Sequence, residues 1–266
     1  MYFLWKLVQY YRMNSNISTK ALFRKENQLH LSECQSTNDV LLQMLRDSDS
    51  MLPEGYLVRA DYQTAGRGQK GNTWDSERGE NLLFSFLVRP HFLAPRHSFW
   101  LSAAMALGIA RALEIWLEDV KVKWPNDVMA GGKKIAGILI ENTITGQMMD
   151  QSVVGIGLNV NQLDLTEQAT SLRKILNQEM DPETVLNRLQ EELASAYFQL
   201  QIAGWEKVKT LYYRYLFKMG QPADFLLPDG LKFTGLIKGV SEDGRLKMVS
   251  ARGEESFGFK EVFFCY

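Results

Sequence analysis

Three parts of the chain carry apolar residues at the spacing of an α-helix. The first begins at residues 36–39, Ser-Thr-Asn-Asp, which form a capping box ahead of an apolar run. The second is expected over residues 98–117, which are rich in small and apolar side chains. The third is expected over residues 182–216, with Pro182 in its first turn and Gly204 as a break between two helices.

Short apolar runs bounded by turn residues predict strands. These runs span residues 55–60, 81–88, 120–123, 127–130, 133–140 and 153–160. Gly131 and Gly132 form a two-residue turn signal, which predicts a hairpin with Lys134 near its bend. Gly155 and Gly157 leave two positions of the last run without a side chain, so another group is able to approach the backbone there.

The pattern divides the chain into three parts and predicts an α+β fold. Residues 1–29 are expected to be an N-terminal extension, residues 30–219 the main domain, and residues 220–266 a small all-β domain. Turn signals such as Pro-Asp-Gly at residues 228–230 separate the short strands of this last part. A unit of roughly fifty residues scarcely stabilises its own core, so we expect it to pack on the main domain.

Composition narrows the classes of function. The chain has 266 residues, of which 45% are hydrophobic and 23% charged, as in an ordinary globular protein. Its net charge of −1 creates no overall positive field that would attract nucleic acid or an anionic membrane, so any anion binding must come from locally placed Arg and Lys. Cys34 and Cys265 form no disulfide or zinc pattern, and residues 1–12 are too short and interrupted to span a bilayer. A reducing, cytoplasmic location is expected.

The stretch 63–74, Gln-Thr-Ala-Gly-Arg-Gly-Gln-Lys-Gly-Asn-Thr-Trp, is the strongest candidate for a ligand loop. Three glycines let its backbone amides approach an anion closely, and two cations can neutralise it, so phosphate is the expected guest. The stretch matches G-x-G-x-x-G, but residues 72–81 continue as loop where a dinucleotide site needs a helix. The H-R-D and D-F-G motifs of protein kinases are also missing from the sequence.

Two further segments carry candidate chemistry. Residues 123–127, Lys-Trp-Pro-Asn-Asp, place a carboxylate and an amide at a strand end, where Asp127 could hold a divalent metal and Asn126 a phosphate oxygen. The plainer interpretation is an Asx turn. Lys134 begins a buried strand, so it must either reach solvent or pair with an anion such as a carboxylate or α-phosphate.

Taken together and in this order, these motifs resemble those of biotin protein ligases. The segments that carry the resemblance are 36–38, 63–68, 123–127, 134–139 and 155–159. The resemblance extends over residues 30 to 266 and is to the short form that has no N-terminal DNA-binding domain. It implies a mixed-sheet catalytic domain similar to class II aminoacyl-tRNA synthetases, followed by an SH3-like β-barrel.

The resemblance also implies an activity with biotin and ATP as substrates and Mg²⁺ as the metal. Biotin and ATP would give biotinyl-5′-AMP, and a lysine of a biotin carboxyl carrier protein would then accept the biotin. Lys134 and Arg67 would be catalytic, and Asp127 would organise Mg²⁺. The residues implied for biotin are Ser36, Thr37, Asn38, Gln63, Gly66, Arg67, Gly68, Gln69, Lys134, Gly137, Gly155 and Gly157. Those implied for the nucleotide are Arg67, Trp74, Lys123, Asn126 and Asn159.

Two departures from the family pattern stand out. Many members have Arg where this chain has Gln69, which removes a cation from the phosphate loop. About thirty-five residues precede Ser36, too few for the winged helix-turn-helix of the bifunctional ligase-repressors. No nucleic-acid or membrane partner is therefore expected, and a homodimer stays open.

Two rival functions remain. A lipoate or octanoate ligase or transferase of related fold would also use a lysine in its site, but residues 66–68 and 123–127 argue against it. A non-catalytic biotin sensor would keep the pocket without turnover. The presence of Arg67, Asp127 and Lys134 favours the enzyme over the sensor.

Overall fold

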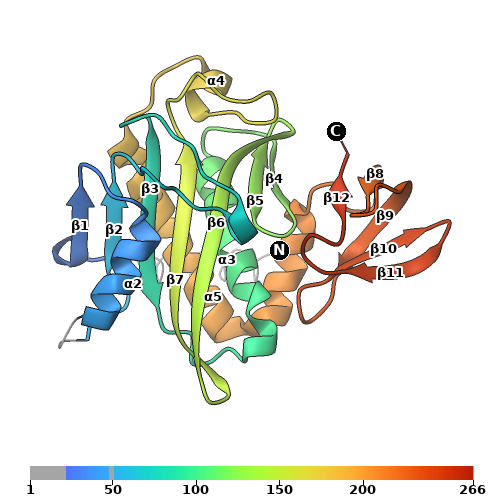
Figure 1. Ribbon diagram of the computed structural model, residues 1–266, viewed down its shortest axis with the longest axis horizontal. Coiled ribbons are helices and arrows are strands. Elements are labelled where there is room, and N and C mark those ends of the chain that lie inside the picture. The colour runs from blue at the N-terminus through green and yellow to red at the C-terminus, as the bar shows by residue number, and fades with distance from the viewer. Residues whose placement is uncertain (1–21, 48–50, 266) are drawn as a thin grey trace, which may run out of the picture.

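A seven-stranded mixed sheet lies at the centre of the computed structural model, which describes residues 22–47 and 51–265 (Figure 1). The order is β1-β2-β3-β7-β6-β5-β4; β1 and β2 run parallel, and the other neighbours run antiparallel. The strands are β1 (Gln28–Leu31), β2 (Leu57–Ala60), β3 (Asn81–Val88), β4 (Val120–Lys123), β5 (Asp127–Ala130), β6 (Lys133–Thr145) and β7 (Met148–Asn159). Of the predicted N-terminal extension, residues 1–21 lie outside the described residues.

Helices cover both faces of this sheet. The α-helices are α2 (Thr37–Asp47), α3 (Phe99–Leu113), α4 (Leu172–Leu176) and α5 (Pro182–Tyr215), and the short 3-10 helices are η1 (Lys25–Asn27), η2 (Gln69–Gly71) and η3 (Pro95–His97). On β2, Leu57 belongs to the large core shared with α3 and α5, whereas Val58 packs with Leu41 of α2. Successive strand residues point to opposite faces, so α2 lies on one side of the sheet and the α3–α5 pair on the other (Figure 1).

Most of the predicted elements are confirmed, with shifted ends. The helix beginning at residues 36–39 starts at Thr37, and the strands predicted over 120–123 and 127–130 have those bounds. The second helix ends at Leu113 rather than residue 117, in a turn where Leu113 O accepts from two later amides. The strand predicted from residue 153 begins at Met148, because residues 148–152 pair with the outer half of β6 although they form no continuous apolar run.

The glycine-rich stretch 63–74 lies between β2 and β3, as predicted. Apart from η2 it has no helical structure, and no helix follows it before β3. The dinucleotide-site interpretation therefore fails on local structure as well as on sequence.

A five-stranded antiparallel sheet follows α5, which is interrupted at Gly204 (φ 77°) as the sequence predicted. Its strands, in the order β11-β10-β9-β8-β12, are β8 (Pro222–Leu226), β9 (Lys232–Val240), β10 (Leu246–Ser250), β11 (Gly253–Phe257) and β12 (Phe263–Phe264). Two tryptophans of the main part of the chain, Trp100 on α3 and Trp124 between β4 and β5, bind the turn between β9 and β10. Trp100 Nε1 donates to Glu242 O, and Trp124 Nε1 donates to Gly244 O. The expected packing of this unit on the main part of the chain is confirmed.

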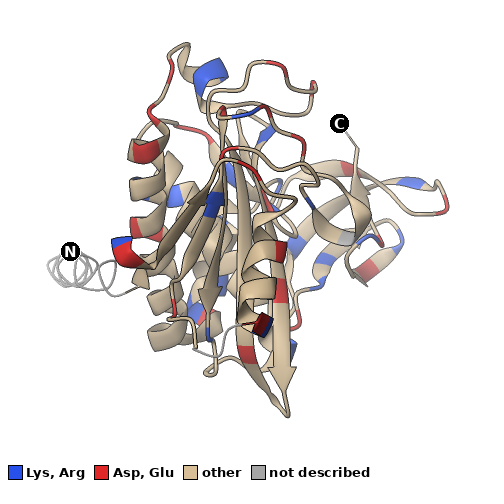
Figure 2. Ribbon diagram, turned by 60° about the vertical axis from the view of Figure 1, so that its left-hand side comes forward, with Lys and Arg blue, Asp and Glu red and all other residues tan. Residues whose placement is uncertain are grey.

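Charge is distributed without a dominant sign. Figure 2 shows basic and acidic residues interspersed over the elements visible in that view. Within the described ranges, every helix is too short or too polar to cross a lipid bilayer.

The docking of the C-terminal sheet can be tested at one glycine. Gly244 and Gly230 both have φ +90°, but a Cβ on Gly244 would lie 2.4 Å from Phe99 Cβ, whereas a Cβ on Gly230 meets nothing within 4 Å. We expect Gly244→Ala to lower the free energy of unfolding by about 2 kcal/mol more than Gly230→Ala. Chemical denaturation of both variants measures the difference, and equal losses would show that the turn does not press on α3.

Candidate active site

A cavity of about 480 Å³ lies beside α2, over the middle strands of the main sheet. Residues that the sequence predicted enter it from five separate segments of the chain. Those that the sequence predicted and that line it are Ser36, Thr37, Asn38, Gln63, Arg67, Gly68, Gln69, Trp74, Lys123, Asn126, Asp127, Lys134, Gly137, Gly155 and Gly157.

The first turn of α2 forms a buried polar wall of this cavity. Ser36, Thr37 and Asn38 are each only 3% exposed. The backbone N–H of Thr37 donates to Gln63 Oε1 at 2.8 Å, which ties the wall to the start of the glycine loop. Close beside it, a Cβ on Gly155 would lie 2.2 Å from Asn38 Oδ1, so only glycine leaves room for this amide. Such a wall offers both donors and acceptors to a neutral polar ligand.

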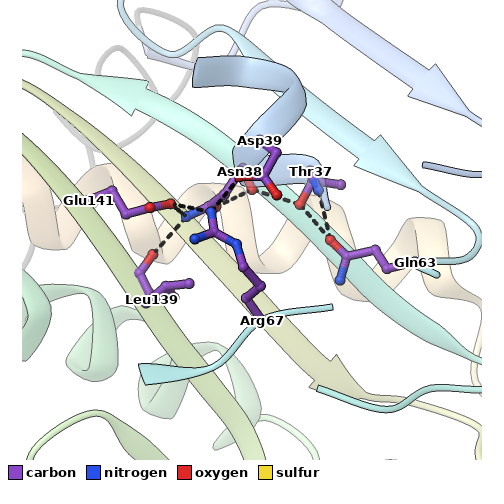
Figure 3. Close-up of polar contacts among 8 residues, drawn as sticks. Thr37, Asn38, Asp39, Gln63, Arg67, Leu139 and Glu141 are labelled. Carbon is purple, nitrogen blue, oxygen red and sulfur yellow. Dashed lines mark hydrogen bonds and ion pairs between the residues drawn. The ribbon is translucent and has the colours of Figure 1, made fainter. Parts of the chain in front are cut away.

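Arg67 extends from the glycine loop to two carboxylates. Its Nη2 lies 2.6 Å from Asp39 Oδ1 and 2.9 Å from Glu141 Oε2, and its side chain is 40% exposed (Figure 3). Among the described residues, the other guanidinium nitrogens have no protein acceptor in hydrogen-bond range. Because a guanidinium has five N–H donors, these two contacts hold the Nη2 end of the group and leave the donors of the other two nitrogens for an anion.

Trp74 closes the glycine loop over the sheet. A Cβ on Gly157 would lie 2.4 Å from the indole, and one on Gly137 would lie 3.0 Å from it, so the ring rests directly on two bare backbone positions. The backbone N–H of Trp74 donates to Gly66 O at 2.9 Å, so this hydrogen bond joins the two ends of the loop segment 66–74. Gly66 itself is not among the residues that line the cavity.

Lys134 and Asp127 form an ion pair on the β5–β6 hairpin. Their Nζ and Oδ1 atoms are 2.7 Å apart, and the side chains are 37% and 19% exposed. The hairpin turns at Gly131 and Gly132, as predicted, and brings the lysine back beside the strand that carries the carboxylate. The backbone of Lys134 is bonded to Gln168 O and to the Thr170 N–H, so its Cα position is held from both sides.

Lys123 approaches the same carboxylate from β4. Burial lowers the pKa of the Lys123 ammonium below its usual value, and the charge of Asp127 opposes that shift. Lys123 Nζ also lies 5.3 Å from the centroid of the Phe264 ring. Lys123, Asp127 and Lys134 thus place two cations around one anion.

The donor set is too small for a metal held by protein alone. Asp127 is the sole acidic residue among the described residues that line the cavity. No group of three or more His, Cys, Asp or Glu in the described ranges could hold a metal. Mg²⁺ commonly binds one or two carboxylates and completes its shell with water and substrate phosphates, and this site fits that mode.

Comparison with known proteins identifies the family. Residues 31–159 match the model of the biotin/lipoate A/B protein ligase family. The biotin--[acetyl-CoA-carboxylase] ligase of Mycobacterium tuberculosis is 30% identical over 223 residues, which cover 81% of this chain and 80% of that protein. The chain belongs to the biotin protein ligase family.

A second relative and a solved structure show how much of each protein the similarity covers. The bifunctional ligase/repressor BirA of Bacillus subtilis is 30% identical over 220 residues, or 79% of this chain, and the chain spans 65% of that protein's length. The structure of the biotin protein ligase from Aquifex aeolicus in complex with biotin and ATP has a TM-score of 0.73 at 28% identity. That alignment covers 90% of this chain and 99% of the other.

Asn159, one of the residues implied by the family pattern, lies outside the cavity lining. It is 4% exposed, and its Nδ2 donates to Thr170 O at 3.0 Å. Its side chain holds the segment after β7, which also carries the backbone partners of Lys134. A direct contact with the nucleotide stays a prediction.

The C-terminal segment lines the cavity although sequence reasoning did not place it there. The residues concerned are Phe259, Lys260, Val262, Phe263 and Phe264. They precede or form β12, the edge strand that pairs with β8. The aromatic pair at 263–264 was visible in the sequence, but only the docking of the second sheet brings it to the site.

Proposed function

We propose that this chain is an ATP-dependent ligase that forms biotinyl-5′-AMP and transfers biotin to a lysine of a biotin carboxyl carrier protein. One observation carries the proposal: the polar wall of α2, the phosphate-type loop with Arg67 and the Lys134–Asp127 pair line a single cavity. Names of the family's relatives support it, because the Mycobacterium protein is called a biotin--[acetyl-CoA-carboxylase] ligase.

In the first step a carboxylate oxygen of biotin attacks the α-phosphorus of ATP. The new P–O bond forms as the bond to the β-phosphate breaks, and pyrophosphate leaves. Thr37 and Asn38 would hold the ureido ring, whose N–H and C=O groups need both acceptors and donors. Arg67 and Lys134 would stabilise the negative charge that shifts onto the phosphates, which is the largest contribution such a site can make.

In the second step the amine of the carrier lysine attacks the carbonyl carbon of the mixed anhydride. An amide bond forms, AMP leaves, and the amine proton passes to solvent. Trp74, resting on Gly137 and Gly157, would keep water from the anhydride while the intermediate waits. Mg²⁺, when bound with ATP, would neutralise phosphate charge beside Asp127.

The remaining parts of the proposal concern architecture and setting. We assign residues 30–219 to a catalytic domain similar to class II aminoacyl-tRNA synthetases and residues 220–266 to an SH3-like barrel. The mixed seven-stranded sheet and the five-stranded antiparallel sheet support this assignment. A cytoplasmic location agrees with two cysteines that form no disulfide.

Biotin-dependent release of pyrophosphate tests the function. With MgATP, the protein should release pyrophosphate on adding biotin and should label a carrier domain at one lysine. Release with lipoate or octanoate in place of biotin would support the related ligases instead. Biotin binding without release would support a sensor.

Position 69 tests how the loop retains the adenylate. Gln69 lines the cavity in η2. An arginine could bind phosphate oxygens through two N–H groups, which an amide cannot, so Gln69→Arg should slow leakage of the adenylate about tenfold. Labelling of a bystander protein measures the leakage, and Gln69→Lys supplies the charge without the planar fork. Unchanged leakage in both variants would show that position 69 does not contact the phosphate.

A further inference from the structure

One carboxylate oxygen connects the two halves of the site. Glu141 Oε2 accepts from Asn38 Nδ2 at 2.7 Å and from Arg67 Nη2 at 2.9 Å (Figure 3). Glu141 lies on β6 opposite Val153 and does not line the cavity. It therefore touches a residue of the proposed biotin wall and a residue of the proposed phosphate loop without reaching the ligand space itself.

The carboxylate also sets the direction of a hydrogen-bond chain. Because a carboxylate only accepts, Asn38 must turn its NH₂ toward Glu141 and its Oδ1 toward Ser85. Ser85 Oγ donates to that oxygen at 2.6 Å, so its single proton is used there. The 2.7 Å contact between Ser85 Oγ and Thr37 Oγ1 must then take its proton from Thr37.

This direction leaves the Thr37 hydroxyl as an acceptor in the cavity. Gln63 Oε1 also lies 3.1 Å from Thr37 Oγ1, but it already accepts the backbone N–H of Thr37 at 2.8 Å. The single hydroxyl proton is directed to Ser85 Oγ, which is the nearer oxygen at 2.7 Å and has no other donor among the described residues. Lone pairs of Thr37 Oγ1 thus face a ligand N–H, as a ureido ring would offer. Ser85 is fully buried, so water does not compete for its hydrogen bonds and the direction of these bonds is kept.

We propose that Glu141 is a positioning residue that orients both the Asn38 amide and the Arg67 guanidinium. It would thereby hold the polar wall of α2, where biotin would bind, in a fixed position relative to the glycine loop, where the phosphates would bind. This inference rests on the proposed function. Asp39, the second acceptor of Arg67, contacts only the guanidinium of these two groups. Glu141 alone connects them among the described residues.

Two substitutions separate its shape from its hydrogen bonds. Glu141→Leu keeps a strand-compatible side chain of similar size and removes both bonds, whereas Glu141→Gln keeps an acceptor for Asn38 and Arg67. We expect Glu141→Leu to weaken biotin binding about tenfold and to lower the maximal rate of pyrophosphate release about tenfold. Glu141→Gln should restore both to within about threefold.

A double-mutant cycle tests whether the effect on biotin binding depends on Asn38 and whether the effect on the maximal rate depends on Arg67. In an Asn38→Ala background, Glu141→Leu should change biotin affinity by less than about twofold, since the amide it orients is gone. In an Arg67→Ala background, it should change the maximal rate by less than about threefold. Asp150→Leu is the matched control, because Asp150 is a hydrogen-bonded carboxylate on the neighbouring strand β7, away from the cavity, and it should leave both quantities unchanged.

Calorimetry with biotin and a pyrophosphate assay give both readouts on the full chain. The wild-type protein is measured first: absence of biotin binding or of release would overturn the proposed function, before any variant is compared. With an active wild type, an unaffected Glu141→Leu, or equal effects in all backgrounds, would overturn the positioning role. Circular dichroism checks that the variants fold, and if Glu141→Leu does not fold, Glu141→Thr replaces it in the cycle.

Discussion

Replacing Lys134 with alanine is expected to slow biotin-dependent pyrophosphate release by about 10²- to 10³-fold, because in the proposed reaction the ammonium would stabilise charge that develops on the phosphates only in the transition state. Its position supports this: Nζ lies at the cavity, 2.7 Å from Asp127 Oδ1 and 5.4 Å from the centroid of the Trp74 ring. Biotin affinity should change far less. Calorimetry and single-turnover release distinguish binding from rate.

The neighbouring lysine provides a matched control. Lys133 has the same charge on the same strand, but it is exposed and does not line the cavity. Lys133→Ala should therefore release pyrophosphate at the wild-type rate. If Lys134→Ala also kept that rate, the lysine would have no part in adenylation, and its ion pair with Asp127 would be structural only.

The second large effect is expected at Gly155. A Cβ there would lie 2.2 Å from Asn38 Oδ1, and the amide has little room to move because Ser85, Glu141 and Leu139 O all bond to it. Gly155→Ala should displace the amide and weaken biotin binding by about 100-fold, since a misplaced buried polar group leaves its partners unpaired. ATP binding should be affected much less.

An Asn38→Ala background tests the cause. Once the amide is gone, a methyl group at position 155 has nothing to displace, so Gly155→Ala should add less than about threefold. Additive losses would show instead that the substitution disturbs β7 itself. Thermal unfolding of the same variants reports any such disturbance directly.

The cavity has contributions from both the main sheet and the C-terminal part of the chain. The turn at Glu242–Gly244 is held by Trp100 and by Trp124, and Trp124 belongs to the same segment as Asn126 and Asp127. The segment before β12 then reaches the cavity. The C-terminal sheet therefore contacts both the segment that carries Asn126 and Asp127 and the cavity itself.

Local chemistry in the sequence determined a large share of this structure. The start of α2, the hairpin at Gly131–Gly132 and the break at Gly204 depend on short-range preferences of individual residues, and the position of all three is confirmed. The family motifs were also readable, because each occupies a few consecutive positions. Glycines at 155 and 157 correctly indicated a close approach to the backbone.

Only the tertiary structure decided which groups meet across long distances. The pairing of Arg67 with Glu141 joins residues 74 positions apart, and no spacing rule predicts it. The place of the last strand likewise depends on how a second sheet docks, since that docking brings Phe263 and Phe264 to the cavity. Asn159 also has a partner that its motif did not indicate, because its Nδ2 donates to the Thr170 carbonyl. Sequence specified the chemical groups, and packing determined their partners.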